Sequence, residues 1–399
     1  MSGRQNIVVV GGSYVGKLTA LSHLFAFPRI GVIPSFEHKA FIPYGSAYFK
    51  AVDGDVLPDS LSGRPSSAIR IHRGAVTSVE PTRVILEDGN SIPYEFLVMA
   101  TGTGRLEAMD KKTGTQIARL AQGRVQKANR IVVVGGGAYG VQVATDIKTY
   151  PPTKDKHITL VHSRDRLMNR FGPELHDVVM ERCHELGIDV ILGNRLVVPH
   201  AGFPDDEEEF DVQLSGGGSV KAKMVLTTGN AAPLSSPLGS LAPESIDPIT
   251  KYIKVKPTLQ IDSAIPYDNV FAVGDVADTG AHKAARPGGA QAAIVARNIG
   301  KLIRAKLKQG HPKANGGLNG SLPNGSDRID ELDAYKPDVP SIHMSLGLDK
   351  GVIFQNSGLD GEGGPIIRHE ESKTQDLAAL MSYSRWWKMR AEGVEDYFS

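Results

Sequence analysis

Two glycine-rich turns, each directly after a short run of β-branched residues, constrain this chain more than any other feature. The first is NIVVVGGSYVG at Asn6–Gly16, and the second is RIVVVGGGAYG at Arg130–Gly140. Such runs are typical of parallel strands buried on both faces. The small residues that follow let the backbone approach a pyrophosphate, whose charge then lies at a helix N-terminus. One such turn is weak evidence, but two favour two bound dinucleotides over two ordinary strand–turn–helix corners.

The 399 residues have the composition of a globular protein, with 41% hydrophobic and 22% charged side chains. This length is enough for two or three domains. The formal net charge of +1 gives no indication of a nucleic-acid partner. No apolar run approaches the ~20 residues of a transmembrane helix, and no basic-then-apolar leader precedes the first strand. We therefore expect a cytoplasmic protein.

Cys183 is the only cysteine, which excludes a disulfide scaffold and a pair of redox-active thiols. A disulfide reductase is excluded for the same reason. The helical pattern ELHDVVMERCHELG around Cys183 predicts a buried, inert thiol. His184 beside it is isolated, and no group of residues has the spacing of a metal site.

The segment Asn269–Asp275 (NVFAVGD) indicates which cofactor the first turn binds. An apolar strand that ends in Gly274-Asp275 places a carboxylate where it can accept hydrogen bonds from the ribityl hydroxyls of a flavin. A helix expected from near Gly288 would direct its N-terminus at the flavin ring and stabilise negative charge there. An ordinary helix cap at Asp275 is the alternative. The first turn is therefore predicted to bind FAD through Gly11, Gly12, Ser13 and Gly16.

The second turn matches the full GxGxxG pattern of a dinucleotide site through Gly135, Gly137 and Gly140. The next strand, HITLVH, ends at His162-Ser163-Arg164 and lacks the acid that holds an unmodified ribose. Ser163 and Arg164 suit a 2′-phosphate, so we expect NADPH to bind at least as well as NADH. The alternative is that Arg164 is an exposed loop residue.

The chain repeats one plan: nucleotide turn, helix, antiparallel strands, apolar run and a Thr-Gly turn. The apolar runs YEFLVMATG and MVLTTG close the two units at Gly102 and Gly229. This order predicts an α/β fold with two Rossmann-like units, inserted antiparallel strands and a C-terminal α+β segment. We expect an FAD-binding domain in two parts, residues 1–104 and 231–307, with an NAD(P)H-binding domain at residues 105–230 between them. A disordered insertion is expected at residues 308–334 and a C-terminal domain at residues 335–399.

Five segments, taken in chain order, resemble the two-dinucleotide-binding flavoproteins of the pyridine nucleotide-disulfide oxidoreductase superfamily: IVVVGGSYVG, YEFLVMATG, RIVVVGGGAYG, VLTTG and NVFAVGD. Five others are similar to its apoptosis-inducing-factor-like group, in the fungal form of the AMID or ferroptosis-suppressor branch: HLFAFPR, EHKAFIPY, GVQVATDI, LVHSRDRLM and SRWWKMR. Type II NADH dehydrogenases are similar more distantly. The resemblance covers nearly the whole chain except residues 308–330, and it implies FAD, NAD(P)H and a quinone-type acceptor.

Site residues follow from the resemblance. It implies further FAD contacts at Tyr14, Val15, Arg29, Val76, Thr101, Gly102 and Asp275. Gly229 joins the NAD(P) contacts His162, Ser163 and Arg164. Hydride transfer from the nicotinamide to the flavin needs no protein acid or base. Lys283 and Gln291 flank the predicted flavin edge and are candidates for acceptor contact, with ordinary surface or helical positions as the alternative.

The first unit departs from the pattern of this family. Gly16 is followed almost at once by HLFAFPR, so about fifteen residues, enough for a strand and most of a helix, are missing. A competing interpretation makes Arg29–Ile33 the second strand and Glu37 the ribose acid. Pro28 and Pro34 bracket that run and argue against a central strand, so we favour the deletion.

Two questions about function stay open. The C-terminal stretch Asp376–Ala391, with Trp386 and Trp387, is predicted either to contact a membrane peripherally, as at a lipid droplet or mitochondrial surface, or to pack in the core. The first choice of function is an FAD-dependent NAD(P)H:quinone-type oxidoreductase. The runner-up is a catalytically weak, nucleotide-binding structural or signalling protein, because the first Rossmann unit is shortened.

Overall fold

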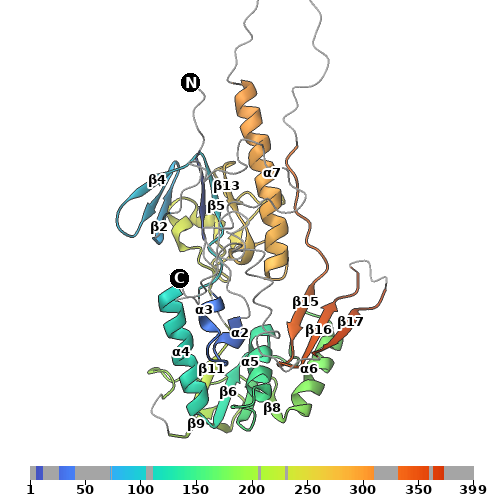
Figure 1. The fold of residues 1–399 in the computed structure, drawn as a ribbon. Helices are drawn as coiled ribbons and strands as arrows, with labels where there is room; N and C mark the ends of the chain where they lie inside the picture. The colour runs from blue at the N-terminus through green and yellow to red at the C-terminus, as the bar shows by residue number, and fades with distance from the viewer. Residues whose placement is uncertain are drawn as a thin grey trace, which may run out of the picture. The chain divides into compact units, whose positions relative to one another are not determined.

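The computed structural model divides the chain into two units, and each is described by itself (Figure 1). Unit 1 comprises Met1–Ser22, Tyr48–Gly104 and Ala232–Asp338, and unit 2 comprises His23–Ala47, Arg105–Ala231 and Val339–Ser399. The described residues are 6–11, 27–40, 72, 74–104, 111–204, 208–229, 232–309, 331–358 and 363–372. Parallel sheets with packed helices confirm the predicted α/β class.

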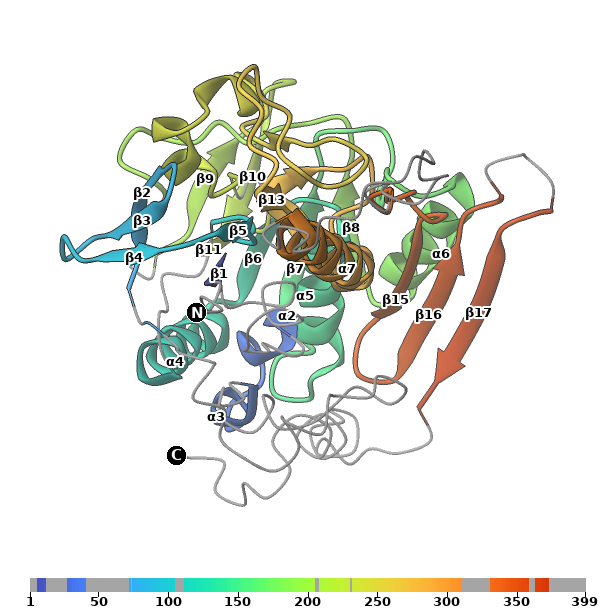
Figure 2. The ribbon, with the colours of Figure 1, turned by 90° about the horizontal axis from the view of Figure 1, so that it is seen from above.

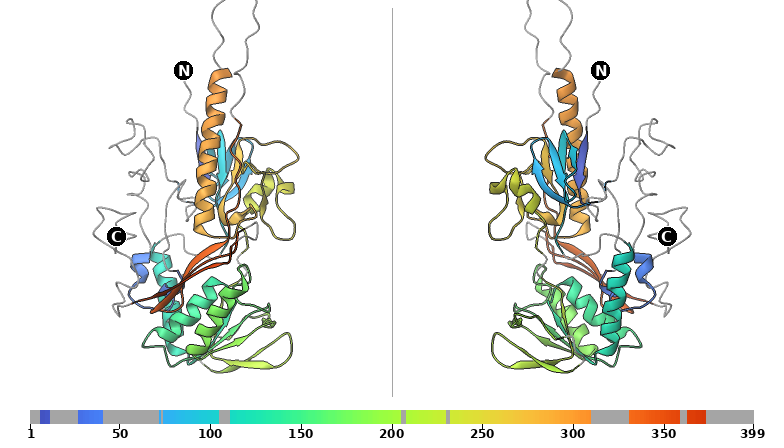
Figure 3. Two further views of the ribbon diagram at one scale, coloured as in Figure 1. Left: turned by 90° about the vertical axis from the view of Figure 1, so that its right-hand side faces the viewer. Right: turned by 90° about the vertical axis from the view of Figure 1, so that its left-hand side faces the viewer.

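A three-stranded parallel sheet organises unit 1. Its order is β1 (Ile7–Val10), β5 (Phe96–Met99) and β13 (Val270–Ala272), with β5 in the middle and fully buried. Alternate side chains of β5 enter separate hydrophobic clusters, one of which contains the inner face of the long helix α7 (Ala285–Gln309). Figure 3 shows α7 running along the sheet. The apolar run at this position is thus buried on both faces, as expected for a central parallel strand.

Strand β1 differs from its counterpart in unit 2. Within the described part of the chain, β1 pairs only with β5, and Ile7 is 48% exposed. The proposed second strand at Arg29–Ile33 is wrong, because Phe27–Ile30 form helix α2 and the chain then turns, with the Val32 and Ile33 amides donating to the carbonyl of Arg29. One-sided pairing of β1 is the arrangement expected if a strand and helix are missing.

The remaining elements of unit 1 surround this sheet. An antiparallel sheet is formed by β2 (Val76–Glu80), β3 (Arg83–Leu86) and β4 (Ser91–Pro93), in agreement with the antiparallel strands expected between the glycine turn and the apolar run. Short pieces complete the unit: η2 (Ser236–Ser240), η3 (Pro243–Ser245), β12 (Ile253–Lys254), η4 (Gly274–Val276) and β14 (Ala277–Asp278). Residues 310–330 of the expected insertion lie outside the described residues, whereas Asp333 pairs with Arg297 and Lys301 of α7.

Unit 2 contains a four-stranded parallel sheet in the order β11 (Met224–Thr227), β6 (Arg130–Val134), β7 (His157–Val161) and β8 (Ile188–Ile191). Here the strand before the glycine turn, β6, has a neighbour on each side. Helices α4 (Lys111–Lys127), α5 (Ala138–Thr149) and α6 (Pro173–Glu185) accompany it, with the antiparallel pair β9 (Phe210–Gln213) and β10 (Ser219–Ala222). None of the described helices is long and apolar enough to cross a membrane.

A C-terminal antiparallel sheet also belongs to unit 2. Its strands are β15 (Ser341–Ser345), β16 (Lys350–Gln355) and β17 (Ile366–Glu371), and β16 lies between the other two (Figure 2). Met344, Val352 and Phe354 share a hydrophobic core with α5, α6, β6 and β7. The stretch 376–391, for which a membrane or core position was predicted, lies outside the described residues.

The short helices α2 and α3 (Glu37–Ala40) also belong to unit 2, where they pack beside α5 and α4. The Arg29 guanidinium donates to both carboxylate oxygens of Asp146 on α5, each at 3.1 Å, and to the carbonyl of Gly347 at 3.0 Å. Asp146 is 1% exposed. Burial raises the pKa of Asp146, and the guanidinium of Arg29 opposes that rise. Glu37 accepts hydrogen bonds from Arg119 and Gln122, so this acid is engaged within unit 2.

We expect Arg29→Met to lower the free energy of unfolding by about 3–5 kcal/mol, because the Asp146 carboxylate would stay buried without its partner. Arg83→Ala is the control, since the exposed Arg83–Glu80 pair contributes about 1 kcal/mol or less. Urea denaturation followed by circular dichroism measures both, and the double variant Arg29→Met/Asp146→Leu should recover part of the loss. Equal urea midpoints for Arg29→Met and the wild type would contradict this role of the pair.

Candidate functional site

The second glycine turn joins β6 to α5 through contacts that only glycine allows. Gly135 has φ +111°, and a Cβ there would lie 2.6 Å from Oγ1 of Thr228. A Cβ on Gly140 would lie 1.8 Å from the carbonyl oxygen of Gly135, because the first turn of α5 is packed directly on the preceding strand. Thr228, just after β11, donates to the carbonyl of Val134 at 2.7 Å. The turn is therefore held from the helix side and from the neighbouring strand.

The N-terminus of α5 is open to an anion. Gly137 is the N-cap residue and has no side chain to cap the helix, and the first turn of α5 contains no acidic residue. A Cβ on Gly137 would meet no atom within 4 Å, so space adjoins the helix end. The amides of a first helical turn, with the positive end of the helix dipole, favour a phosphate group. The residues present thus fit the pyrophosphate of a dinucleotide.

The structure brings the predicted NAD(P) residues to one edge of the unit 2 sheet. His162 directly follows β7 and is buried, with its Nδ1 accepting the Gly136 amide at 3.0 Å. Burial lowers the pKa of His162, and the charge of Arg164 lowers it further. Ser163 is half-buried, whereas Arg164 is exposed and donates to Asn169 at 3.1 Å. Gly229 follows β11, and its amide nitrogen would lie 3.5 Å from a Cβ on Gly135.

In unit 1 the first turn leaves β1 at Gly11, which has φ +116°. A Cβ on Gly11 would lie 2.3 Å from the carbonyl oxygen of Ala100, the residue after β5. This contact brings the start of the turn against Thr101 and Gly102, and Thr101 donates its hydroxyl to the carbonyl of Leu234 at 2.7 Å. The other predicted residues of this turn, Gly12, Ser13, Tyr14, Val15 and Gly16, lie outside the described residues.

The Asp275 turn stands at the carboxyl end of the same sheet. Strand β13 leads into η4, and the Gly274 amide donates to Oε1 of Gln291 at 2.7 Å. The same Gln291 donates from Nε2 to the hydroxyl of Thr279 at 3.0 Å and is 2% exposed. Gln291, expected at the acceptor, therefore supports the turn that presents Asp275. A half-buried carboxylate at the end of a parallel sheet fits the predicted ribityl contact of a flavin.

Three further predicted residues have other surroundings. Lys283 donates to the carbonyl of Ala277, and its Nζ lies 4.2 Å from the centre of the Tyr252 ring. Val76 begins β2 and is half-buried. Arg29 belongs to unit 2, where Asp146 and Gly347 bind its guanidinium. The structure thus gathers Gly11, Thr101, Gly102 and Asp275 around one sheet and places Arg29 in the other unit.

The lone cysteine and the acidic residues offer no redox or metal centre. Cys183 is buried on α6, as the sequence predicts, and burial raises the pKa of its thiol to about 12. A thiol with such a pKa is protonated and unreactive at neutral pH. Within the described residues, no group of three or more His, Cys, Asp or Glu side chains could hold a metal ion.

Two glycine variants separate the structural role of the turn from its binding role. Gly140→Ala is expected to lower the unfolding free energy by about 1–3 kcal/mol or more, because its methyl group would overlap the Gly135 carbonyl. Gly137→Ala should change it by less than about 1 kcal/mol, yet weaken NADPH binding, because its methyl group fills the open space. Thermal denaturation and NADPH titration measure the two effects, and wild-type stability of Gly140→Ala would contradict the packing argument.

Comparison with known proteins shows the family of this chain. Residues 38–300 match the family described as pyridine nucleotide-disulphide oxidoreductase. Fe-regulated protein 8 of Mycosarcoma maydis is 30% identical over 394 residues, covering 88% of each chain. Ferroptosis suppressor protein 1 of Mus musculus is 28% identical over 380 residues, again covering 88% of each. Apoptosis-inducing factor homolog B of Dictyostelium discoideum is 27% identical over 393 residues, covering 88% of this chain and 89% of its own.

A solved structure shares the fold. The sulfide:quinone oxidoreductase of Aquifex aeolicus superimposes with a TM-score of 0.68 at 17% identity, covering 98% of this chain and 92% of its own. At that identity the likeness concerns the fold alone. With the family match and the relatives, the two dinucleotide turns identify the chain as a member of the pyridine nucleotide-disulphide oxidoreductase family, in its apoptosis-inducing-factor-like group, with FAD and NAD(P)H as cofactors.

Proposed function

We propose that this oxidoreductase transfers reducing equivalents from NAD(P)H by way of FAD to a quinone-type acceptor. We assign FAD to unit 1, where Gly11, Thr101, Gly102 and Asp275 would hold it, and NAD(P)H to the glycine turn of unit 2. Bound FAD supplies the chemistry of accepting a hydride and passing two electrons on. The protein binds and orients both cofactors, and the helix dipole of α5 stabilises the pyrophosphate.

The buried, solitary Cys183 is the observation that supports a small external acceptor. Flavoproteins of this family fold that reduce disulfides need a pair of thiols near the flavin. Here the only thiol is buried and has a pKa of about 12. Electrons therefore leave to a diffusible molecule, and a quinone accepts the two electrons that a reduced flavin carries. The sulfide:quinone oxidoreductase with the same fold is named for such an acceptor, which supports the proposal by analogy only.

The alternative is a catalytically weak nucleotide-binding protein, and the one-sided pairing of β1 favours it. Strand β1 leads into the FAD turn, so a sheet with fewer pairings at that edge would hold the turn less firmly. Peripheral membrane contact through residues 376–391 and a cytoplasmic location stay predictions.

The purified chain should be yellow, with the absorbance of bound flavin, and should reduce a soluble quinone with NADPH at least as fast as with NADH. We expect NADPH to be used at least as fast as NADH because Arg164 is exposed and no acid directly follows β7. Flavin absorbance and quinone-dependent loss of NAD(P)H absorbance are the measurements. A folded, colourless and inactive protein would support the alternative, and a clear NADH preference would refute the cofactor choice.

Gln291→Leu is expected to weaken FAD binding about tenfold, because the Gly274 amide would lose its buried acceptor and the turn carrying Asp275 would loosen. The dissociation constant is measured by flavin fluorescence on the apoprotein. Gln122→Leu is the matched control: its buried amide donates to the carbonyls of Ile30 and Ile33 in unit 2, so stability should fall without a change in FAD affinity. Wild-type FAD affinity in Gln291→Leu would show that the Gly274–Gln291 hydrogen bond does not contribute to FAD binding.

A further inference from the structure

The imidazole of His162 is fixed against the second glycine turn. Its main chain is bound on both sides, since the His162 amide donates to Ile191 at 2.8 Å and its carbonyl accepts from Asn194 at 3.1 Å. A Cβ on Gly136 would lie 2.9 Å from Cγ of His162 and 2.3 Å from Leu167, so glycine is what lets the ring approach the turn. The ring is held at the carboxyl end of β7, where the adenosine ribose of a dinucleotide is bound in this fold.

One hydrogen bond decides which nitrogen of the ring carries the proton. Nδ1 accepts the Gly136 amide at 3.0 Å, so Nδ1 is unprotonated. Burial and the charge of Arg164 lower the pKa of the ring against smaller opposing effects of the Asn169 side chain, the Arg166 backbone and Asp165, so the neutral form is favoured. A neutral imidazole with an acceptor at Nδ1 has its hydrogen on Nε2. His162 is therefore a hydrogen-bond donor of fixed direction.

That donor has no hydrogen-bond partner among the described residues. His162 is 7% exposed, and its Nε2 has no hydrogen-bond partner within the part of the chain that the structure describes. A buried N–H group without an acceptor is rare in folded proteins, because it has lost its bonds to water without replacement. A ligand that brings an oxygen to Nε2 would remove this deficit.

We propose that Nε2–H of His162 donates to the 2′ group of the adenosine ribose of NAD(P)H, to the hydroxyl oxygen in NADH and to a phosphate oxygen in NADPH, a role that rests on the proposed function of this turn. The acid usual at this position accepts from a ribose hydroxyl and repels a 2′-phosphate. A neutral donor repels neither the ribose hydroxyl nor the 2′-phosphate, and its hydrogen bond to the charged phosphate is stronger than its hydrogen bond to the hydroxyl. His162 thereby selects NADPH, with the exposed Arg164 beside it as a further positive charge.

The test compares His162→Asn with His162→Gln in the FAD-loaded protein. Asn places its Oδ1 near the position of Nδ1, so His162→Asn keeps an acceptor for Gly136 and removes only the Nε2 donor. Gln keeps an amide donor near Nε2 and loses the acceptor. Calorimetric titration with NADP+ and NAD+ measures affinity, and thermal denaturation measures the structural effect.

We expect His162→Asn to bind NADP+ about tenfold to a hundredfold more weakly than the wild type, with a smaller loss for NAD+ and a nearly unchanged Tm. His162→Gln should have a lower Tm and a smaller loss of NADP+ affinity. A His162→Asn variant that binds NADP+ like the wild type, with only His162→Gln impaired, would overturn the proposal and leave His162 a structural support of the turn.

Failure of the proposed function gives a different result, because then the wild type binds neither nucleotide.

Should His162→Asn not fold, wild-type protein with 15N-labelled histidine provides the test. The resonance of His162, assigned by its absence in His162→Gln, should show an unprotonated Nδ1, and NADP+ should shift Nε2. An Nε2 resonance that NADP+ leaves unmoved would overturn the proposal.

Discussion

Close backbone contact at a glycine in the turn after a parallel strand is the constraint on which both sites depend. Gly140 touches the carbonyl of Gly135 so closely that any side chain would overlap it, and this contact directs the N-terminus of α5 to the end of β6. Because β7 and β11 flank β6 in parallel, His162 and Gly229 reach the same edge. In unit 1, Gly11 meets Ala100 in the same manner, which sets the first turn beside the end of β5.

The strand before the glycine turn is paired differently in the two units. In unit 2 the strand before the turn is central, whereas in unit 1 β1 has a described partner on one side only. Unpaired backbone groups are costly only where water cannot reach them, and the exposure of Ile7 shows that water reaches the start of β1. A shortened first unit is therefore compatible with a folded sheet. The binding strength of its turn then depends more on β5 and on the Asp275 turn after β13.

Local sequence predicts the features that local chemistry determines. The two turns, the apolar strands, the Asp275 turn and the buried Cys183 all follow from residues that are near neighbours in the chain. Arg29 and Asp146, in contrast, are 117 residues apart in the chain, and the hydrogen-bonded residues Gly274 and Gln291 are 17 residues apart. Nothing around Arg29 marks it as a partner of α5, so the resemblance alone assigned it to FAD. The polar pattern of Gln291 on a helix fits a surface position equally well until the fold buries it.

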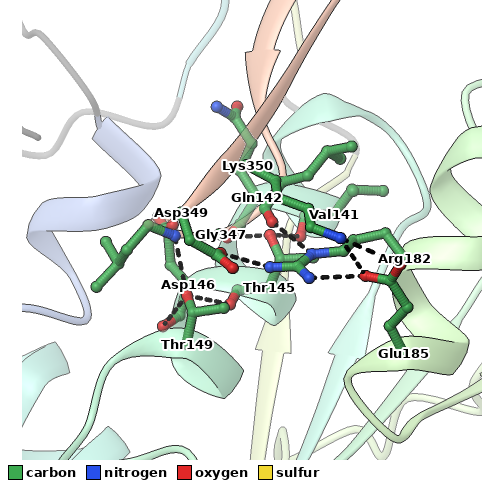
Figure 4. A network of polar contacts seen from close by, with 12 residues as sticks. Val141, Gln142, Thr145, Asp146, Thr149, Arg182, Glu185, Gly347, Asp349 and Lys350 are labelled. Atoms are coloured by element: carbon green, nitrogen blue, oxygen red, sulfur yellow. Dashed lines mark hydrogen bonds and ion pairs between the residues drawn. The ribbon is translucent and has the colours of Figure 1, made fainter. Parts of the chain in front are cut away.

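Helix α5 connects the nucleotide turn to parts of unit 2 that are distant in sequence. Beyond its N-terminus, Gln142 donates to Ser345 of β15 and Thr149 accepts the Leu348 amide. Asp146 binds Arg29, and Arg182 of α6 binds Leu346 and Asp349 in the β15–β16 turn (Figure 4). Displacement of α5 would break these buried contacts together, and buried polar groups left unpaired are costly. The direction of the first-turn amides is thus fixed from the far end of the helix. The C-terminal sheet and Arg29 therefore support the second glycine turn through α5.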